Sequence, residues 1–150
     1  MPSTIPSHIY TMIALAAVGA LLVASINAYT TTLRTTSEIE QLKNLLSVVA
    51  AEGTDLLTIA ASTNSSTQVF LQLPATIGYQ QYWMRAGNDS SCTWIEGNLG
   101  QITDIESSNR VFLPQGTSAS GTLAGGYGPA ILKSYMNGST PQLNIASLGG

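Results

Sequence analysis

Apolar residues follow two different patterns along the chain, and the change falls near residue 65. Up to residue 62 they are either continuous or recur at helical spacing, whereas later they alternate with polar residues over short stretches. The small polar stretch 61–67 separates the two patterns as a linker. The pattern predicts an α+β protein, with a long N-terminal hydrophobic helix over residues 1–62. A small, antiparallel, β-sandwich-like domain would occupy residues 63–150.

The first pattern begins with 20 almost wholly apolar residues, Ile9 to Ala28, and none of the first 33 residues is charged. A helix of about 20 apolar residues spans the ~30 Å hydrocarbon core of a membrane. Ala and Leu, which dominate the run, favour a helix over a strand. A cleaved signal peptide fits less well, because the run is long and no basic segment precedes it. We therefore expect the helix to be retained.

The helical pattern continues beyond this run and becomes amphipathic between Tyr29 and Ser62. One helix could therefore extend over about 50 residues, or roughly 75 Å. Its weak points are the Tyr29–Thr32 run, which is poor in helix formers, and Gly53. The positions predicted to form an assembly surface along it are Ile9, Ile13, Leu15, Val18, Leu21, Leu22, Ile26, Leu33, Leu42, Leu45, Leu46, Val49 and Leu56.

The second pattern predicts short strands separated by turns. The expected strands cover Val69–Leu73, Tyr79–Arg85, Cys92–Glu96, Gln101–Ile105, Arg110–Leu113, Ile131–Met136 and Gln142–Ser147. The expected turns cover 86–91, 114–116, 125–129 and 137–138. The last of these, Asn137-Gly138, is the strongest short hairpin signal.

Charge is scarce throughout the chain. Charged residues make up 9% of it, against 17 Ser and 17 Thr, so hydroxyls and amides supply the polar surface. The net charge is −3 with five basic residues, which argues against binding to nucleic acid. The one cysteine, Cys92, excludes a disulfide framework and a Cys-based zinc site. We expect Cys92 to be a small buried hydrophobe.

Residue types that carry catalysis are sparse. The one histidine, His8, precedes the apolar run, so no Ser-His-Asp or Cys-His arrangement can form in the β domain. Asp104 and Glu106 would share a face of a predicted strand, but a solvated edge explains them better than paired catalytic carboxylates. The Gly-rich stretch 125–128 lacks the Lys of a phosphate loop. We expect a protein that is not an enzyme and uses no metal or cofactor; a membrane-tethered hydrolase is the disfavoured alternative.

Three Asn-x-Ser sequons begin at Asn64, Asn88 and Asn137, each in a predicted turn or linker. A chain rich in Ser and Thr produces one or two by chance, but their placement in loops suits N-linked glycans. Glycosylation would put the β domain outside the cell.

The basic residues give the opposite orientation. Arg34 and Lys43 follow the apolar run, and the positive-inside rule would place that side in the cytoplasm. Two basic residues beside Glu38 and Glu40 are a faint signal. We follow the sequons and expect an outside location.

Taken together, the N-terminal apolar segment, the continuing amphipathic helix and the small charge-poor β domain resemble archaeal type IV pilins and archaellins. The stretch Leu73–Tyr82 (LPATIGYQQY) is similar to the LP-x-x-IG-x-x-x-Y strand opening of many such subunits. The resemblance implies a homopolymer whose helices form the filament core and whose β domains form a glycosylated shell. It also implies storage in the cytoplasmic membrane before assembly.

Two features depart from the family pattern. Family precursors carry a basic leader that is cut before the apolar segment, and this sequence shows none. Either Met1 follows the cut or the chain is unprocessed. Bacterial relatives place a Glu near the start of the apolar segment, and its absence here fits the archaeal branch.

Physical reasoning also favours a filament. Apolar positions at helical spacing continue past the membrane span, and they must be covered by neighbouring copies or by the chain's own β domain. Contacts that do not close into a ring generate filaments. Small residues allow helices to approach closely; they are Ala14, Ala16, Ala17, Gly19, Ala20, Ala24, Ser25 and Ala28.

Two functional hypotheses follow. The first is a structural subunit of a pilus-like or archaellum-like filament for adhesion or motility. The second is a single-pass accessory protein, similar to an archaellum stator component or minor pilin, whose β domain binds a partner outside the membrane.

Overall fold

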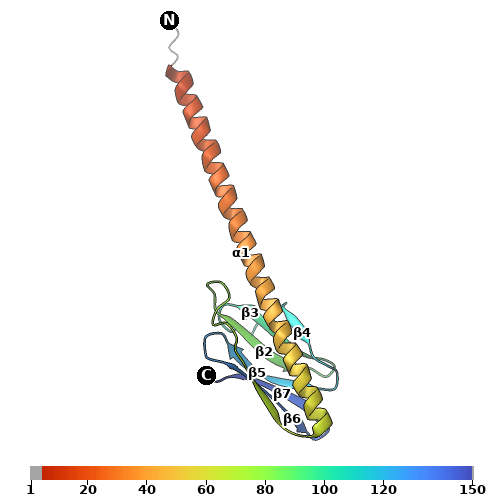
Figure 1. Ribbon diagram of the computed structural model, residues 1–150. Helices are drawn as coiled ribbons and strands as arrows, with labels where there is room; N and C mark the ends of the chain where they lie inside the picture. Colours follow the sequence, from red (N-terminus) through yellow and green to blue (C-terminus); the bar gives the residue numbers. More distant parts are fainter. Residues whose placement is uncertain (1–4, 150) are drawn as a thin grey trace. The chain divides into compact units, whose positions relative to one another are not determined.

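The computed structural model describes residues 5–149, with side chains from Ser7 onward, and shows one helix followed by seven strands (Figure 1). The predicted α+β class is confirmed. The elements are α1 (Ile5–Thr63), β1 (Thr67–Leu71), β2 (Tyr82–Asn88), β3 (Thr93–Leu99), β4 (Arg110–Phe112), β5 (Ser118–Ala124), β6 (Ala130–Asn137) and β7 (Thr140–Ser147).

The helix is continuous across both predicted weak points, the Tyr29–Thr32 run and Gly53. Gly53 has a packing role, since a Cβ there would lie 2.7 Å from Leu143 Cδ2. The glycine thus lets the helix backbone approach the sheet closely. The helix ends where Asn64 takes a left-handed conformation (φ 52°) and donates its backbone N–H to Ala60 O at 2.9 Å. Asn is one of the residues that tolerate this cap.

The chain forms two compact units. The first lies within residues 1–37, and its described part is helix alone. The second begins at Glu38, so it contains the C-terminal part of α1 together with all seven strands. We call this second unit the compact unit, and the packing of α1 described below lies within it.

The strands form one sheet in the order β1-β6-β7-β5-β2-β3-β4. All neighbours are antiparallel except β5 and β7, which are parallel. The first part of β5 pairs with β7 and its last residues pair with β2, so β5 joins the two halves of the sheet. The sandwich-like arrangement is corrected in one respect, because the layer that faces this single sheet is a helix.

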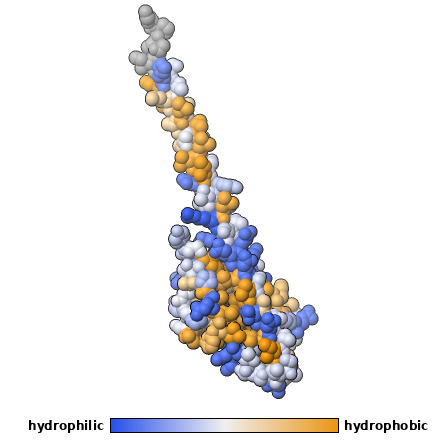
Figure 2. Space-filling model, in the orientation of Figure 1, coloured by the Kyte–Doolittle hydropathy of each residue, from blue (hydrophilic) through white to orange (hydrophobic). Residues whose placement is uncertain are grey.

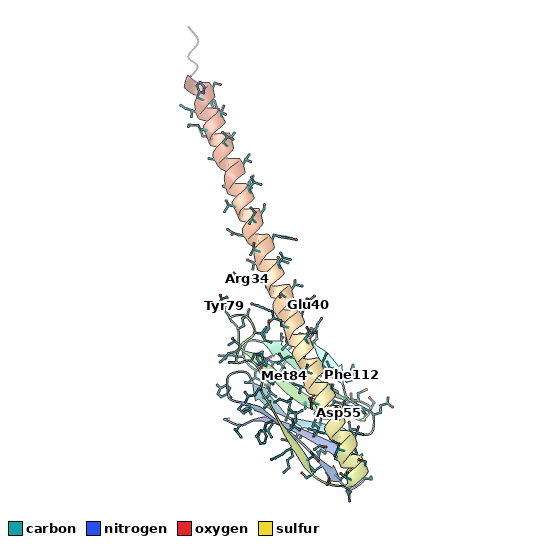
Figure 3. All side chains as sticks on the ribbon, viewed as in Figure 1. Arg34, Glu40, Asp55, Tyr79, Met84 and Phe112 are labelled. Atoms are coloured by element: carbon teal, nitrogen blue, oxygen red, sulfur yellow. The ribbon has the colours of Figure 1, made fainter. Side chains whose placement is uncertain are left out.

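The core lies between α1 and one face of the sheet. Leu42, Leu46 and Val49 of the helix are fully buried there. They share one core with inward residues of the strands, among them Leu132 and Met84, of which Figure 3 labels Met84. These inward residues alternate with outward ones along each strand. A helix stripe at three- and four-residue spacing therefore covers a sheet face of period two.

Six predicted strands are confirmed with bounds shifted by a few residues, and the 137–138 hairpin turn joins β6 to β7. The strand predicted over Gln101–Ile105 is wrong, because residues 100–109 form a loop. Strand β5 was not predicted. Its sequence, Ser-Ala-Ser-Gly-Thr-Leu-Ala, is mostly small residues with a weak alternation.

Candidate assembly surface and the structure around it

The N-terminal unit presents apolar side chains with no protein covering them. Leu15 is 67% exposed and Leu22 is 59% exposed. Figure 2 shows apolar surface over much of the described part of this unit. Among the described residues, one helix is long and apolar enough to cross a membrane, with a mean hydropathy of 2.3 over its most apolar window. Such a surface needs lipid or other protein to cover it.

Most Ser and Thr hydroxyls in the described part of this unit are bonded to the helix itself. Thr11, Ser25, Thr30 and Thr31 each donate to the carbonyl four residues earlier, at 2.8–2.9 Å. A polar side chain bonded in this way can enter an apolar environment without leaving a donor unpaired. The Thr-rich segment is therefore compatible with burial among lipids or other helices.

The structure divides the predicted assembly residues into two sets. Leu42, Leu46, Val49 and Leu56 are buried within the single chain and Leu45 is partly buried, so none of the four buried residues can contact a second copy. Their apolar stripe is explained by the chain's own sheet. The set that stays exposed comprises Ile9, Ile13, Leu15, Val18, Leu21, Leu22, Ile26 and Leu33.

The family-like stretch Leu73–Tyr82 forms a corner at the entry to β2. Tyr82 is buried and its hydroxyl donates to Pro74 O at 2.7 Å, and burial raises the pKa of this phenol. Ile77 is buried in the core. Gly78 has a φ of +60°, and a Cβ there would collide with the Glu38 carboxylate. The residues of the Leu73–Tyr82 stretch thus stabilise one corner of the chain, which packs against the helix near Glu38.

All three sequons lie on the surface. Asn64 follows the end of α1, Asn88 ends β2 and Asn137 ends β6, and each side chain is exposed. A glycan at any of them would extend from the end of a helix or strand into solvent. The structure therefore leaves room for modification at each site.

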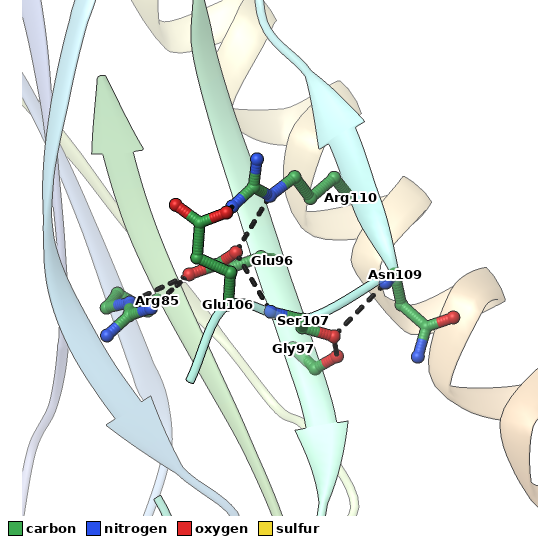
Figure 4. Close-up of polar contacts among 7 residues, drawn as sticks. All are labelled: Arg85, Glu96, Gly97, Glu106, Ser107, Asn109 and Arg110. Carbon is green, nitrogen blue, oxygen red and sulfur yellow. Dashed lines mark hydrogen bonds and ion pairs between the residues drawn. The ribbon is translucent and has the colours of Figure 1, made fainter. Parts of the chain in front are cut away.

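A row of charged residues crosses the outer face of the sheet, away from the helix. Register places Arg85 opposite Glu96, and Glu96 opposite Arg110, on β2, β3 and β4. Arg85 Nε donates to Glu96 Oε1 at 2.8 Å, and Arg110 Nε donates to Glu96 Oε2 at 2.9 Å (Figure 4). Glu96 is 2% exposed. We call Arg85, Glu96 and Arg110 the charged row; cross-strand pairs of opposite charge stabilise sheets.

Sequence reasoning missed the charged row. Burial raises the pKa of Glu96, but the hydrogen bonds and charges of both arginines outweigh it and hold that pKa below its ordinary value. Two tryptophans flank the row, with Arg85 over Trp83 and Arg110 over Trp94, 5.6 and 4.6 Å from the ring centroids. Each arginine is thus fixed by a carboxylate and an aromatic face.

The charged row also anchors the 100–109 loop. Ser107 N–H donates to Glu96 Oε2 at 3.3 Å, and Ser107 Oγ donates to Gly97 O at 2.6 Å (Figure 4). Glu106 pairs with Arg110 at 3.0 Å, whereas Asp104 lies exposed in the same loop. The expectation that Asp104 and Glu106 share a strand face is therefore wrong, because this segment is not a strand.

The other candidate residues have local roles. Cys92 is partly exposed in the turn between β2 and β3, and so is less buried than expected. Stretch 125–128 lies in the predicted turn, which joins β5 to β6. Within the described part of the chain, no group of three or more His, Cys, Asp or Glu side chains could hold a metal ion.

Comparison with models of protein families, with curated proteins and with solved structures finds no match. The class of the protein therefore rests on its own architecture. A long apolar N-terminal helix, whose C-terminal part packs against a mostly antiparallel sheet, is a pilin-like architecture. Its N-terminal helix is long and apolar enough to anchor it in a membrane or to act as a signal.

Proposed function

We propose that the chain is a structural, non-catalytic subunit of an archaeal type IV pilus-like or archaellum-like surface filament, serving adhesion or motility. The observation that carries the proposal is the exposed apolar segment Ile9–Leu33. The membrane would hold this segment before assembly, and copies of the same helix would cover it afterwards. The β domain, glycosylated at Asn64, Asn88 or Asn137, would face outside.

Two features support a homopolymer over a simple anchor. The uncharged, exposed part of the helix reaches Leu33, beyond the roughly 20 residues that a span requires. Small residues, including Gly19 and Ala20, allow close helix contacts. The Ser and Thr hydroxyls of the segment are bonded to its own backbone, so they oppose burial neither among lipids nor among other helices. The stripe from Leu42 to Leu56 is not part of this argument, because the chain's own sheet covers it.

Electron microscopy of fibres sheared from producing cells, with mass spectrometry of their main protein, tests the proposal directly. The chain should be the main component, and the spectrum would also give its N-terminus and any glycans. Absence from fibres, with a monomeric chain in the membrane, would support the single-pass accessory protein instead.

A paired substitution separates assembly from anchoring. Ala20→Leu keeps the segment apolar, so we expect unchanged membrane insertion, but its added bulk should keep helices apart and abolish fibres. Leu21→Met conserves volume and apolarity and is the matched control, with fibres retained. Normal fibres from Ala20→Leu would exclude close helix packing at this position.

A further inference from the structure

A hollow of about 570 Å³ opens in the compact unit, on a different part of the chain from the assembly segment. The beginning of β2, the first residues of the 100–109 loop and the ends of β5 and β7 surround it. Its volume falls within the ~300–1,000 Å³ range of small-ligand sites. Nothing in the proposed filament function uses it.

The polar groups that line the hollow are uncharged. Gln81 and Gln101 contribute amides, and Thr122 and Ser147 contribute hydroxyls. Among the residues that the structure describes, no Asp, Glu, Lys, Arg or His lines it. Within residues 5–149 these four side chains take part in none of the hydrogen bonds that the structure shows. They offer both donors and acceptors to a ligand, without a charge to select an ion.

Aromatic surface accompanies these polar groups. Tyr127, in the turn after β5, lines the hollow and is half-exposed, whereas Trp83 lines it from the outer face of the sheet but is only 1% exposed and offers a ligand almost no surface. A flat ring beside a rim of amides and hydroxyls matches a pyranose, which presents C–H groups on its faces and hydroxyls around its edge.

The wall of the hollow is held in place before any ligand arrives. Gly100 N–H donates to Gln81 O at 2.6 Å, which fixes the start of the loop to the start of β2. The far end of the same loop is held by Ser107 on Glu96 and Gly97. A pre-ordered wall reduces the entropy lost on binding.

We propose that this hollow is a binding site for neutral saccharides. Tyr127 supplies the stacking face, and Gln81, Gln101 and Thr122 supply hydrogen bonds to ring hydroxyls. The site belongs to the folded unit of a single chain, so it does not depend on polymerisation. A surface filament that carried it would present one such site per subunit.

The test uses the full chain in a phosphocholine detergent, because sugar-headed detergents would compete. Neutral hexasaccharides of mannose, glucose and N-acetylglucosamine are titrated separately, with an acidic galacturonate oligomer for comparison. Calorimetry and tryptophan fluorescence report binding. We expect at least one neutral oligosaccharide to bind and to shift the fluorescence, and the acidic oligomer to bind more weakly.

Two variants and a control locate the site. Tyr127→Ala and Thr122→Val should each weaken binding by roughly tenfold, and circular dichroism checks that both stay folded. Tyr79→Ala removes a tyrosine that is 91% exposed and does not line the hollow, so affinity should not change. The proposal is overturned if no neutral oligosaccharide binds at millimolar concentration, if the acidic one binds best, or if binding survives both variants.

Discussion

Helix α1 has two segments that differ in what covers their apolar residues. Between residues 38 and 63 its apolar stripe is covered by the sheet of the same chain, and polar residues such as Glu40 face solvent. Between Ile9 and Leu33 the described apolar residues are exposed and no charged residue occurs. One segment is thus stabilised within the molecule, and the other needs a medium or a partner. Amphipathic spacing marks the first, and uniform apolarity marks the second.

The largest difference between the two segments should appear when a leucine is truncated in each. Leu46→Ala empties a site that is 0% exposed and should lower the free energy of unfolding of the compact unit by about 2–5 kcal/mol. Leu22→Ala, in the exposed segment, should leave it unchanged. Denaturant unfolding of the full chain in detergent, followed by tryptophan fluorescence, measures both. Equal effects would mean that the two segments are not independent.

Charge gives the next comparison, because the N-terminal segment has none. Glu96→Gln removes the negative member of the charged row and leaves Arg85 beside Arg110, so we expect a loss of about 1.5–3 kcal/mol in the compact unit. Denaturant unfolding measures it. Asp104→Asn, at an exposed carboxylate of the neighbouring loop, is the control and should have almost no effect. A stable Glu96→Gln would show that the row is replaceable.

The two segments should also differ in their response to acid. The pKa of Glu96 is held below its ordinary value of 4.5, so the folded unit binds fewer protons than the unfolded chain. The stability from Glu96 is therefore present above about pH 4.5 and lost as the pH falls through the folded pKa. Asp89, whose pKa is lowered by the Ser91 and Cys92 N–H groups, acts in the same direction.

A pH series of unfolding midpoints tests this expectation, and Glu96→Gln should flatten part of the acid slope. The helicity of the N-terminal segment should not change over the same range, because its first 33 residues hold no carboxylate. An unaltered slope in Glu96→Gln would assign the acid sensitivity to other groups.

The smallest expected effect concerns single hydroxyls. Tyr82→Phe removes the hydrogen bond to Pro74 O and should lower the free energy of unfolding of the compact unit by about 1 kcal/mol. Thr31→Val removes a hydroxyl bonded to Asn27 O on the exposed helix and should not change that free energy. Thermal unfolding followed by circular dichroism distinguishes the two. A neutral Tyr82→Phe would mean that packing alone holds the Leu73–Tyr82 corner.

The spacing of apolar residues along the chain predicted most of the secondary structure, because helices and strands each impose one spacing. The helix and six strands follow from spacings of 3.6 and 2. Strand β5 escaped because Ala119 and Leu123 are separated by small residues, although they do alternate inward. The 101–105 stretch has the composition of a strand, yet it lies exposed in a loop whose far end is fixed by Ser107.

The charged row shows what a sequence leaves out. Glu96 is 11 residues from Arg85 and 14 from Arg110, and only strand register brings them together. Knowledge of the four-residue turn between Asn88 and Thr93 would have placed Arg85 opposite Glu96. Likewise, the stripe from Leu42 to Leu56 was visible in the sequence, but its partner surface was not. The sequon positions needed no such long-range information.

Strand β7 pairs with β5, and its Leu143 packs beside Gly53 of the helix. The cover over the helix is therefore complete only after β7 has been made. Strand β7, which completes the cover over the helix, is made about 90 residues after Leu57. At about 5–20 residues per second the ribosome needs roughly 5–20 seconds for that stretch. During this interval the sheet that covers the leucines of the helix is incomplete. We therefore expect the nascent chain to be more prone to aggregate before β7 emerges than after it.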